Sequence, residues 1–245
     1  MKKEEIAITV KDLHVYYRDM NRFSLKRSGV KGRGSGKIFK ALKGVSFEVP
    51  KGQILGICGK NGSGKSTLLR AISGIFSPDS GSINLHGNTI SLLSIGVGFQ
   101  KKLTGYENIY LSGMLLGYSK EQIDEKVDEI IEFSELGDFV YKPVSSYSSG
   151  MYSKLAFSIT AILETDIMLI DEVLSVGDIH FKEKSYNKMK ELISDSDRTV
   201  VIVSHSTKTI VELCDKVIWL HDGLIKYEGK PEEIMEKYES FMRQD

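Results

Sequence analysis

A glycine-rich stretch at residues 59–67 has the composition and spacing of a loop that binds phosphate groups. It reads Gly-Lys-Asn-Gly-Ser-Gly-Lys-Ser-Thr and contains the pattern G-x-x-x-x-G-K-[ST] in full. Its glycines allow backbone N–H groups to curl around phosphate oxygens, Lys65 reaches the β- and γ-phosphates, and the Ser66 hydroxyl ligates Mg²⁺. The residues expected to contact nucleotide here are Gly59, Asn61, Gly62, Ser63, Gly64, Lys65, Ser66 and Thr67.

The surroundings of this stretch favour the same interpretation. An apolar run at residues 54–58 precedes it and a helical run at residues 68–73 follows it, which is the strand-to-helix setting that such a loop requires. Residues 34–37, Gly-Ser-Gly-Lys, contain only half of the pattern: position 31 is Lys and position 38 is Ile. We interpret residues 34–37 as a flexible basic loop and not as a nucleotide site.

Two carboxylates, Asp171 and Glu172, follow the four apolar residues 167–170. An uninterrupted apolar run of this length is typical of a strand buried on both faces of a parallel sheet, and ligands bind at the carboxyl edge of such sheets. We expect Asp171 to hold Mg²⁺, directly or through water, and Glu172 to orient or deprotonate the attacking water. The alternative is a strand that ends in two solvated acids.

A second apolar run, residues 199–203, ends in Ser204 and His205. The same reasoning brings His205 to the edge of the sheet, where it would bond to the γ-phosphate or the attacking water. A surface histidine that caps the following helix is the alternative. The remaining histidines are expected to be structural: His14, His86, His180 and His221.

Residues 148–150, Ser-Ser-Gly, open a second candidate anion site. They begin a helical stretch, and the free N–H groups of a helix N-terminus attract anions.

The order of these motifs along nearly the whole chain resembles that of the ATP-binding cassette family. The resemblance implies that Ser148, Ser149 and Gly150 contact the γ-phosphate of ATP held by the other copy in a head-to-tail dimer. Residues 175–178, Ser-Val-Gly-Asp, match the family's D-loop, whose Asp178 joins the nucleotide-binding residues.

Two further nucleotide contacts come from this resemblance. Gln100 matches the family's glutamine that contacts Mg²⁺, takes part in catalysis and couples the site to a membrane partner. Tyr17 falls where the family stacks an aromatic ring on adenine, and Tyr16 and Phe39 are rival candidates.

Three stretches resemble one branch of the family, the ATPase subunits that export polysaccharides: residues 97–111, 147–157 and 171–178. The resemblance implies a Mg²⁺-dependent ATP hydrolase that works with integral membrane permease subunits to move a lipid-linked glycopolymer. Teichoic acid is the first candidate, and O-antigen or capsular polysaccharide the others. An importer or drug-exporter ATPase is the nearest alternative. A soluble ATPase of DNA repair or translation is disfavoured because the chain has neither a long coiled-coil insertion nor a second cassette.

Composition limits the possibilities further. The chain has 245 residues, of which 41% are hydrophobic and 27% charged, with a formal net charge of zero. These values are ordinary for a globular protein and give no indication of nucleic-acid binding. No apolar run reaches the length of a membrane span, the N-terminus lacks the core of a signal peptide, and two unpatterned cysteines suggest a reducing compartment. We therefore expect a peripheral protein on the cytoplasmic face of the cell membrane.

The predicted fold class is α/β: a P-loop NTPase with a doubly wound parallel RecA-like core, an antiparallel β-subdomain and an α-helical signature subdomain. Residues 1–245 would form one nucleotide-binding domain. Its core would comprise 1–100 and 164–230, its helical subdomain 101–163, and its last helix 231–243. Within these parts, strands are expected at 6–15, 40–49 and 82–85, and amphipathic helices at 108–116 and 121–133.

Two surface features complete the predictions. The basic insert at residues 18–38 is either a solvated loop or a contact for anionic lipid headgroups or a polyanionic glycan. A groove for a helix of the membrane partner is expected near the start of the helical subdomain. Its apolar lining would be Leu103, Tyr106, Ile109, Tyr110 and Met114.

Overall fold

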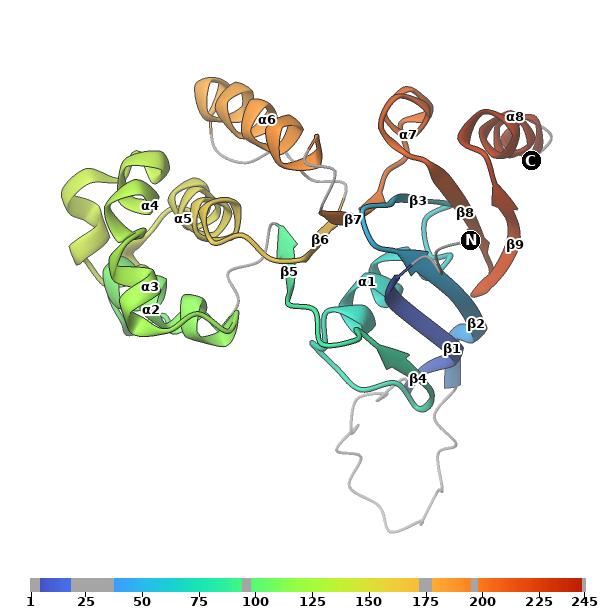
Figure 1. Ribbon diagram of the computed structural model, residues 1–245, viewed down its shortest axis with the longest axis horizontal. Coiled ribbons are helices and arrows are strands. Elements are labelled where there is room, and N and C mark those ends of the chain that lie inside the picture. Colours follow the sequence, from blue (N-terminus) through green and yellow to red (C-terminus); the bar gives the residue numbers. More distant parts are fainter. Residues whose placement is uncertain (1–4, 19–37, 94–97, 172–177, 195–197, 244–245) are drawn as a thin grey trace, which may run out of the picture.

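Figure 1 shows the computed structural model of the chain, which describes residues 5–18, 38–93, 98–171, 178–194 and 198–243. The predictions for Glu172, for residues 175–177 and for the segment 19–37, which includes 34–37, lie outside the described residues.

A six-stranded sheet forms the centre of the molecule, in the order β5-β6-β7-β3-β8-β9. The pairs from β5 to β8 are parallel, and only β9 is antiparallel to its neighbour. The strands are β3 (Ile54–Cys58), β5 (Ile90–Leu93), β6 (Ile167–Ile170), β7 (Thr199–Val203), β8 (Lys216–His221) and β9 (Leu224–Gly229). Every residue of β6 and β7 is buried, which confirms the interpretation of these two apolar runs.

Both faces of this sheet are covered because successive side chains of a strand point to opposite sides. In β7, Val201 and Val203 pack into one hydrophobic core, whereas Val200 and Ile202 pack into another. The first core lies between the central sheet, helix α1 (Lys65–Ile72) and a second sheet. Helices α6 (Ile179–Ile193), α7 (Thr207–Leu213) and α8 (Pro231–Met242) pack on the other face, together with part of α5 (Ser149–Ile162).

The second sheet is antiparallel and has the order β2-β1-β4. Its strands are β1 (Ile6–Arg18), β2 (Ile38–Pro50) and β4 (Ser80–Asn84), and they confirm the three strands expected in these regions. Figure 1 shows α1 between this sheet and the central one. Helix α1 thus begins at the carboxyl end of β3 and is held from two sides.

A helical lobe lies at the β5 end of the sheet (Figure 1). It contains α2 (Gly105–Leu115), α3 (Lys120–Asp124), α4 (Val127–Ser134), two short 3₁₀ turns (Gly137–Tyr141 and Val144–Ser146) and α5 (Ser149–Ile162). The lobe has a hydrophobic core of its own. Helix α5 belongs to two cores, because Leu155 and Ile159 pack into the lobe and Phe157 packs under the central sheet.

Two expectations for the lobe need correction. Residues 121–133 form two helices and not one, because the chain turns at Lys126, whose N–H donates to the Ile123 carbonyl. Ile109 is fully buried in the lobe core and therefore cannot line an open groove, whereas Met114 is 53% exposed. None of the helices in the described part of the chain is long and apolar enough to cross a membrane.

Candidate functional site

The glycine-rich loop connects β3 to α1, as its sequence predicts. Gly64 stands immediately before α1 with φ 106°, a left-handed conformation that favours glycine, and no side chain caps the helix. The first N–H groups of α1 have no partner within the helix, because no residue one turn earlier is helical. They therefore offer hydrogen bonds and a positive partial charge to an anion.

The side chains of Lys65 and Ser63 are also suited to phosphate binding in this loop. The ammonium of Lys65 donates to the carbonyls of Gly59 at 2.7 Å and Lys60 at 3.0 Å, which holds it inside the loop although its residue is only 6% exposed. The buried hydroxyl of Ser63 has no hydrogen-bond partner among the described residues. A buried hydroxyl in such a position is suited to an incoming acceptor.

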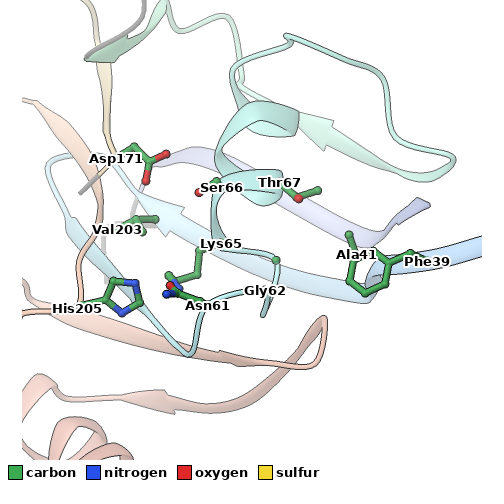
Figure 2. Close-up of a pocket in the computed structure, with 11 residues that line it drawn as sticks. Phe39, Ala41, Asn61, Gly62, Lys65, Ser66, Thr67, Asp171, Val203 and His205 are labelled. Atoms are coloured by element: carbon green, nitrogen blue, oxygen red, sulfur yellow. The ribbon is translucent and has the colours of Figure 1, made fainter. Parts of the chain in front are cut away.

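The pocket above the loop has a volume of about 210 Å³ and gathers residues from distant parts of the chain. Figure 2 shows Asp171 and His205 together at one end, Lys65 and Ser66 in the middle, and Phe39 at the opposite end. Asp171 follows β6 and His205 follows β7 after Ser204, so the parallel strands bring both to one edge of the sheet. The structure thus brings together the phosphate loop, the carboxylate and the histidine.

The three aromatic candidates for adenine are separated by strand geometry. Tyr17 and Phe39 are directly opposite each other on β1 and β2 and so lie on the same face. Tyr17 bonds to the Thr67 hydroxyl at 3.3 Å, and both Phe39 and Thr67 line the pocket. Tyr16 lies on the other face, with its hydroxyl 3.0 Å from Nδ1 of His14.

Gln100 is not among the residues that line this pocket. Its backbone is held instead by Asn108 of α2, whose side-chain oxygen accepts from the Gln100 N–H at 2.7 Å and whose amide donates to the Gln100 carbonyl at 3.1 Å. Asn108 is fully buried and also donates to the carbonyls of Leu103 and Thr104. Sequence reasoning missed Asn108, and apolar spacing could not have found it, because the buried face of α2 is mostly small or polar: Gly105, Asn108, Ile109, Ser112 and Gly113.

The Ser-Ser-Gly stretch opens α5, as predicted. Ser148 is the N-cap of the helix and its hydroxyl accepts from the Met151 N–H at 3.2 Å. Among the described residues, a methyl group placed on Gly150 would meet nothing nearer than the Ser148 hydroxyl at 3.8 Å, which leaves this helix end accessible to an approaching group.

A second pocket of about 400 Å³, here called the signature pocket, lies at this helix end. Its lining is Glu135, Leu136, Phe139, Ser148, Gly150, Met151, Lys154 and Asp178. Among the residues that the structure describes, it shares no lining residue with the pocket above the phosphate loop. Within one chain, the two candidate phosphate-binding ends are therefore separate.

Comparison with known proteins agrees with this geometry. Residues 42–175, which include the phosphate loop, Ser148–Gly150 and Asp171, match the sequence model of the family described as ABC transporter. The chain belongs to the ABC transporter family. Membership confirms the resemblance found in the sequence, and this family of ATPases binds ATP.

Three curated members of the ABC transporter family illustrate the similarity. The O-antigen export system ATP-binding protein RfbB of Klebsiella pneumoniae is 41% identical over 84% of this chain and 84% of its own length. RfbB of Myxococcus xanthus is 43% identical over 82% of this chain and 46% of its own length. The teichoic acids export ATP-binding protein TagH of Lactococcus lactis is 46% identical over 84% of this chain and 44% of its own length. The chain thus spans about half the length of the last two.

Solved ABC structures confirm the fold class. One ATP-binding subunit of an ABC transporter has a TM-score of 0.70 at 22% identity and covers 95% of this chain and 93% of that one. A dimeric ATP-binding cassette in a post-hydrolysis state, bound to ADP and Pi, has a TM-score of 0.68 at 22% identity and covers 91% of this chain and 98% of that one.

Proposed function

We propose that this protein is the ATP-hydrolysing subunit of an ABC exporter that moves a lipid-linked glycopolymer across the cytoplasmic membrane. The observation that carries the proposal is the pocket above the phosphate loop, where Lys65, Ser66, Asp171 and His205 converge. The names of the relatives supply the substrate class, since they export teichoic acids or O-antigen.

The residues of the pocket fit a nucleoside triphosphate with Mg²⁺. The α1 N-terminus, the Lys65 ammonium and the Ser63 hydroxyl, which has no partner in the described part of the chain, suit the phosphates. The Ser66 hydroxyl and the Asp171 carboxylate are the oxygen donors that Mg²⁺ prefers. Bound Mg²⁺ would neutralise charge on the β- and γ-phosphates. Tyr17 and Phe39 together would hold adenine at the far end of the pocket.

Hydrolysis needs two further roles. Glu172, next in sequence to Asp171, would accept a proton from the attacking water, and His205 would bond to the γ-phosphate. Gln100 would join the Mg²⁺ site only after the loop that Asn108 holds has moved toward the pocket, and this requirement would link the metal site to the lobe.

The separate signature pocket suggests that two copies act together. In a head-to-tail dimer, Ser148, Ser149 and Gly150 of one copy would meet the γ-phosphate bound by the other. The exposed N-terminus of α5 supports this arrangement, because its N–H groups attract anions and no side chain among the described residues obstructs Gly150.

Contact with the permease subunits would use the exposed end of α2. Met114 is 53% and Leu115 58% exposed, and Leu115 lies against Gly98, two residues from Gln100. A helix of the membrane protein placed here would contact both the lobe and the loop that carries Gln100. The buried Ile109 is excluded from this surface.

Phosphate release by the purified protein tests the enzymatic part. The wild-type protein should hydrolyse ATP in the presence of Mg²⁺, and Lys65→Met should lose nearly all activity. Lys60→Met is the control, because it changes a lysine at a variable position of the same loop. In cells that lack the gene, wild-type protein but not Lys65→Met should restore the surface glycopolymer. An unchanged amount of surface glycopolymer after gene deletion would refute export.

A further inference from the structure

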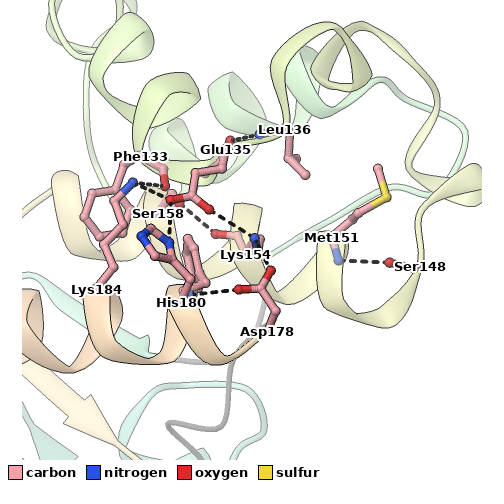
Figure 3. Close-up of polar contacts among 12 residues, drawn as sticks. Phe133, Glu135, Leu136, Ser148, Met151, Lys154, Ser158, Asp178, His180 and Lys184 are labelled. Carbon is pink, nitrogen blue, oxygen red and sulfur yellow. Dashed lines mark hydrogen bonds and ion pairs between the residues drawn. The ribbon is translucent and has the colours of Figure 1, made fainter.

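One lysine of the lobe is bound at once to two acidic residues that belong to different helices. The ammonium of Lys154, on α5, lies 3.1 Å from Oε2 of Glu135 and 2.8 Å from Oδ2 of Asp178 (Figure 3). It also lies 4.9 Å from the centre of the Phe181 ring. The side chains of Lys154 and Glu135 are 13% and 29% exposed, so solvent screens their ion pair less than that of a typical surface lysine. The Asp178 side chain is 61% exposed, so its ion pair with Lys154 is more accessible to solvent.

Each acidic partner sits at a helix terminus and has a second bond that fixes it. Glu135 ends α4 in a left-handed conformation with φ 57°, and its other oxygen lies 3.0 Å from Lys184. Asp178 is the N-cap of α6 and its Oδ1 accepts from the Phe181 N–H at 3.0 Å. The hydrogen bond from Lys154 is the largest cause that lowers the pKa of the Asp178 carboxyl, to about 2. The carboxylate therefore stays charged throughout the neutral range.

The position of this cluster relates it to the signature pocket. Lys154 is four residues beyond Gly150 and so lies one helical turn above it on the same face of α5. Lys154, Glu135 and Asp178 all line the pocket into which the α5 N-terminus opens. Two of its walls, the lobe wall of α5 and the wall formed by Asp178 of α6, are joined by the Lys154 ammonium.

We propose that Lys154 is a positioning residue that keeps the α5 N-terminus and Asp178 in register across the signature pocket. The inference rests on the proposed function, in which Ser148–Gly150 meet the triphosphate of a partner copy. When Lys154 holds the α5 N-terminus and Asp178 together, both reach the triphosphate of the partner copy in the same docking movement. Without Lys154, α5 and α6 remain attached by apolar contacts but lose the ion pair that fixes Asp178 relative to α5.

Four variants separate this role from general stability. Lys154→Met removes both ion pairs, and Lys154→Arg retains the charge and reaches both carboxylates. Asp178→Asn removes the charge but keeps an N-cap for α6, because Asn caps helices as well as Asp does. Lys184→Met is the matched control, since it removes an ion pair to the same Glu135 and leaves the Lys154–Asp178 pair intact.

The experiment measures steady-state phosphate release, melting temperature and the Kd of a fluorescent ATP analogue. We expect Lys154→Met and Asp178→Asn each to reduce turnover at least about tenfold, because misplacement of reacting groups by about 1 Å can cost about 100-fold. The Kd should change less than about twofold, because the phosphate-loop pocket and the signature pocket have no described residue in common. Lys154→Arg should recover most of the turnover, and Lys184→Met should match the wild type.

Two results would overturn this inference and leave the proposed function standing. One is undiminished turnover in Lys154→Met, and the other is a loss of turnover in Lys184→Met equal to that in Lys154→Met. If Lys154→Met fails to fold, Asp178→Asn decides by the same criterion of turnover at unchanged Kd. A wild-type protein that releases no phosphate from ATP would overturn the proposed function, and this inference with it.

Discussion

Two glycines of the phosphate loop differ in what surrounds them, and this difference permits a quantitative test of the loop geometry. Gly62 and Gly64 both have a left-handed conformation, with φ 82° and φ 106°. A methyl group on Gly62 would meet no described residue within 4 Å, whereas one on Gly64 would lie 2.6 Å from the carbonyl oxygen of Ala41 on β2. Substitution by alanine therefore measures the conformational cost alone at Gly62, and that cost plus a steric clash at Gly64.

The magnitudes follow from these distances. An L-residue in the left-handed region costs about 1–2 kcal/mol, and alanine returns about 0.4–1 kcal/mol by restricting the unfolded chain. Gly62→Ala should thus destabilise by about 1 kcal/mol. Gly64→Ala adds an overpacking cost of about 1–3 kcal/mol, because Ala41 belongs to a paired strand that cannot easily retreat. For a chain of this size, each kcal/mol lowers the melting temperature by about 2–4 °C.

A melting experiment without and with nucleotide measures both effects. Without nucleotide, Gly64→Ala should melt about 6–12 °C below the wild type, near 3 kcal/mol of destabilisation, and Gly62→Ala about 2–4 °C below it. ATP at a hundred times its Kd stabilises the wild type by about 2.7 kcal/mol. Gly62→Ala should lose most of this gain, because its methyl group would occupy the pocket that Gly62 lines. If the two variants melt at the same temperature without nucleotide, or if Gly62→Ala keeps the full gain, the described loop geometry is wrong.

Three further predictions concern other parts of the chain. Glu172→Gln should retain ATP binding and slow hydrolysis by about 10²–10⁴, the usual contribution of a general base, and normal turnover would remove Glu172 from that role. Tyr17→Ala should weaken ATP binding about 5- to 100-fold in a direct titration, as expected for loss of about 1–3 kcal/mol of stacking, whereas Tyr16→Ala should leave the Kd unchanged. Burial raises the pKa of the Cys58 and Cys214 thiols to about 12, so iodoacetamide at pH 8 should label both only as fast as the protein unfolds, and rapid labelling of the native protein would contradict their burial.

The parts of the fold that the sequence predicts are those encoded by short, local patterns. The phosphate loop is identified by residue types at fixed spacing, and β6 and β7 by uninterrupted apolar runs. Because such runs indicate a parallel sheet, the meeting of Asp171 and His205 at one edge also follows from the sequence.

The choice among the aromatic residues could not be made from the sequence. Tyr16 and Tyr17 are adjacent in a strand, so one of them must face away from the pocket, and register with β2 decides which. That register contains shifts, one of them between Val15 and Tyr16, and no local sequence pattern indicates where they occur. The pairing of Tyr17 with Phe39 is therefore information that only the folded structure contains.

The interruption at Lys126 and the inward position of Asn108 depend on packing within the lobe. The apolar spacing of residues 121–133 is compatible with one continuous helix, and the sequence contains no proline or glycine at the turn. In the structure, Ile123 and Val127 are both buried in the lobe core on either side of the break. Tertiary contacts, which determine how these side chains reach the core, override a periodic pattern of this length.

The joint between lobe and core shows why ion pairs matter in a region already held by apolar contacts. Phe133 packs against both the lobe core and the core under the sheet, with its ring 6.0 Å from that of Phe157 and 5.8 Å from that of Phe181. Apolar burial is non-directional, so it attaches the lobe without fixing how far the lobe rotates about this contact. The ion pairs of Lys154 lie beside the aromatic contact and have defined partners and distances. Attachment by the phenylalanines and orientation by the charges are therefore separable, and a substitution at Lys154 should change the second with little effect on the first.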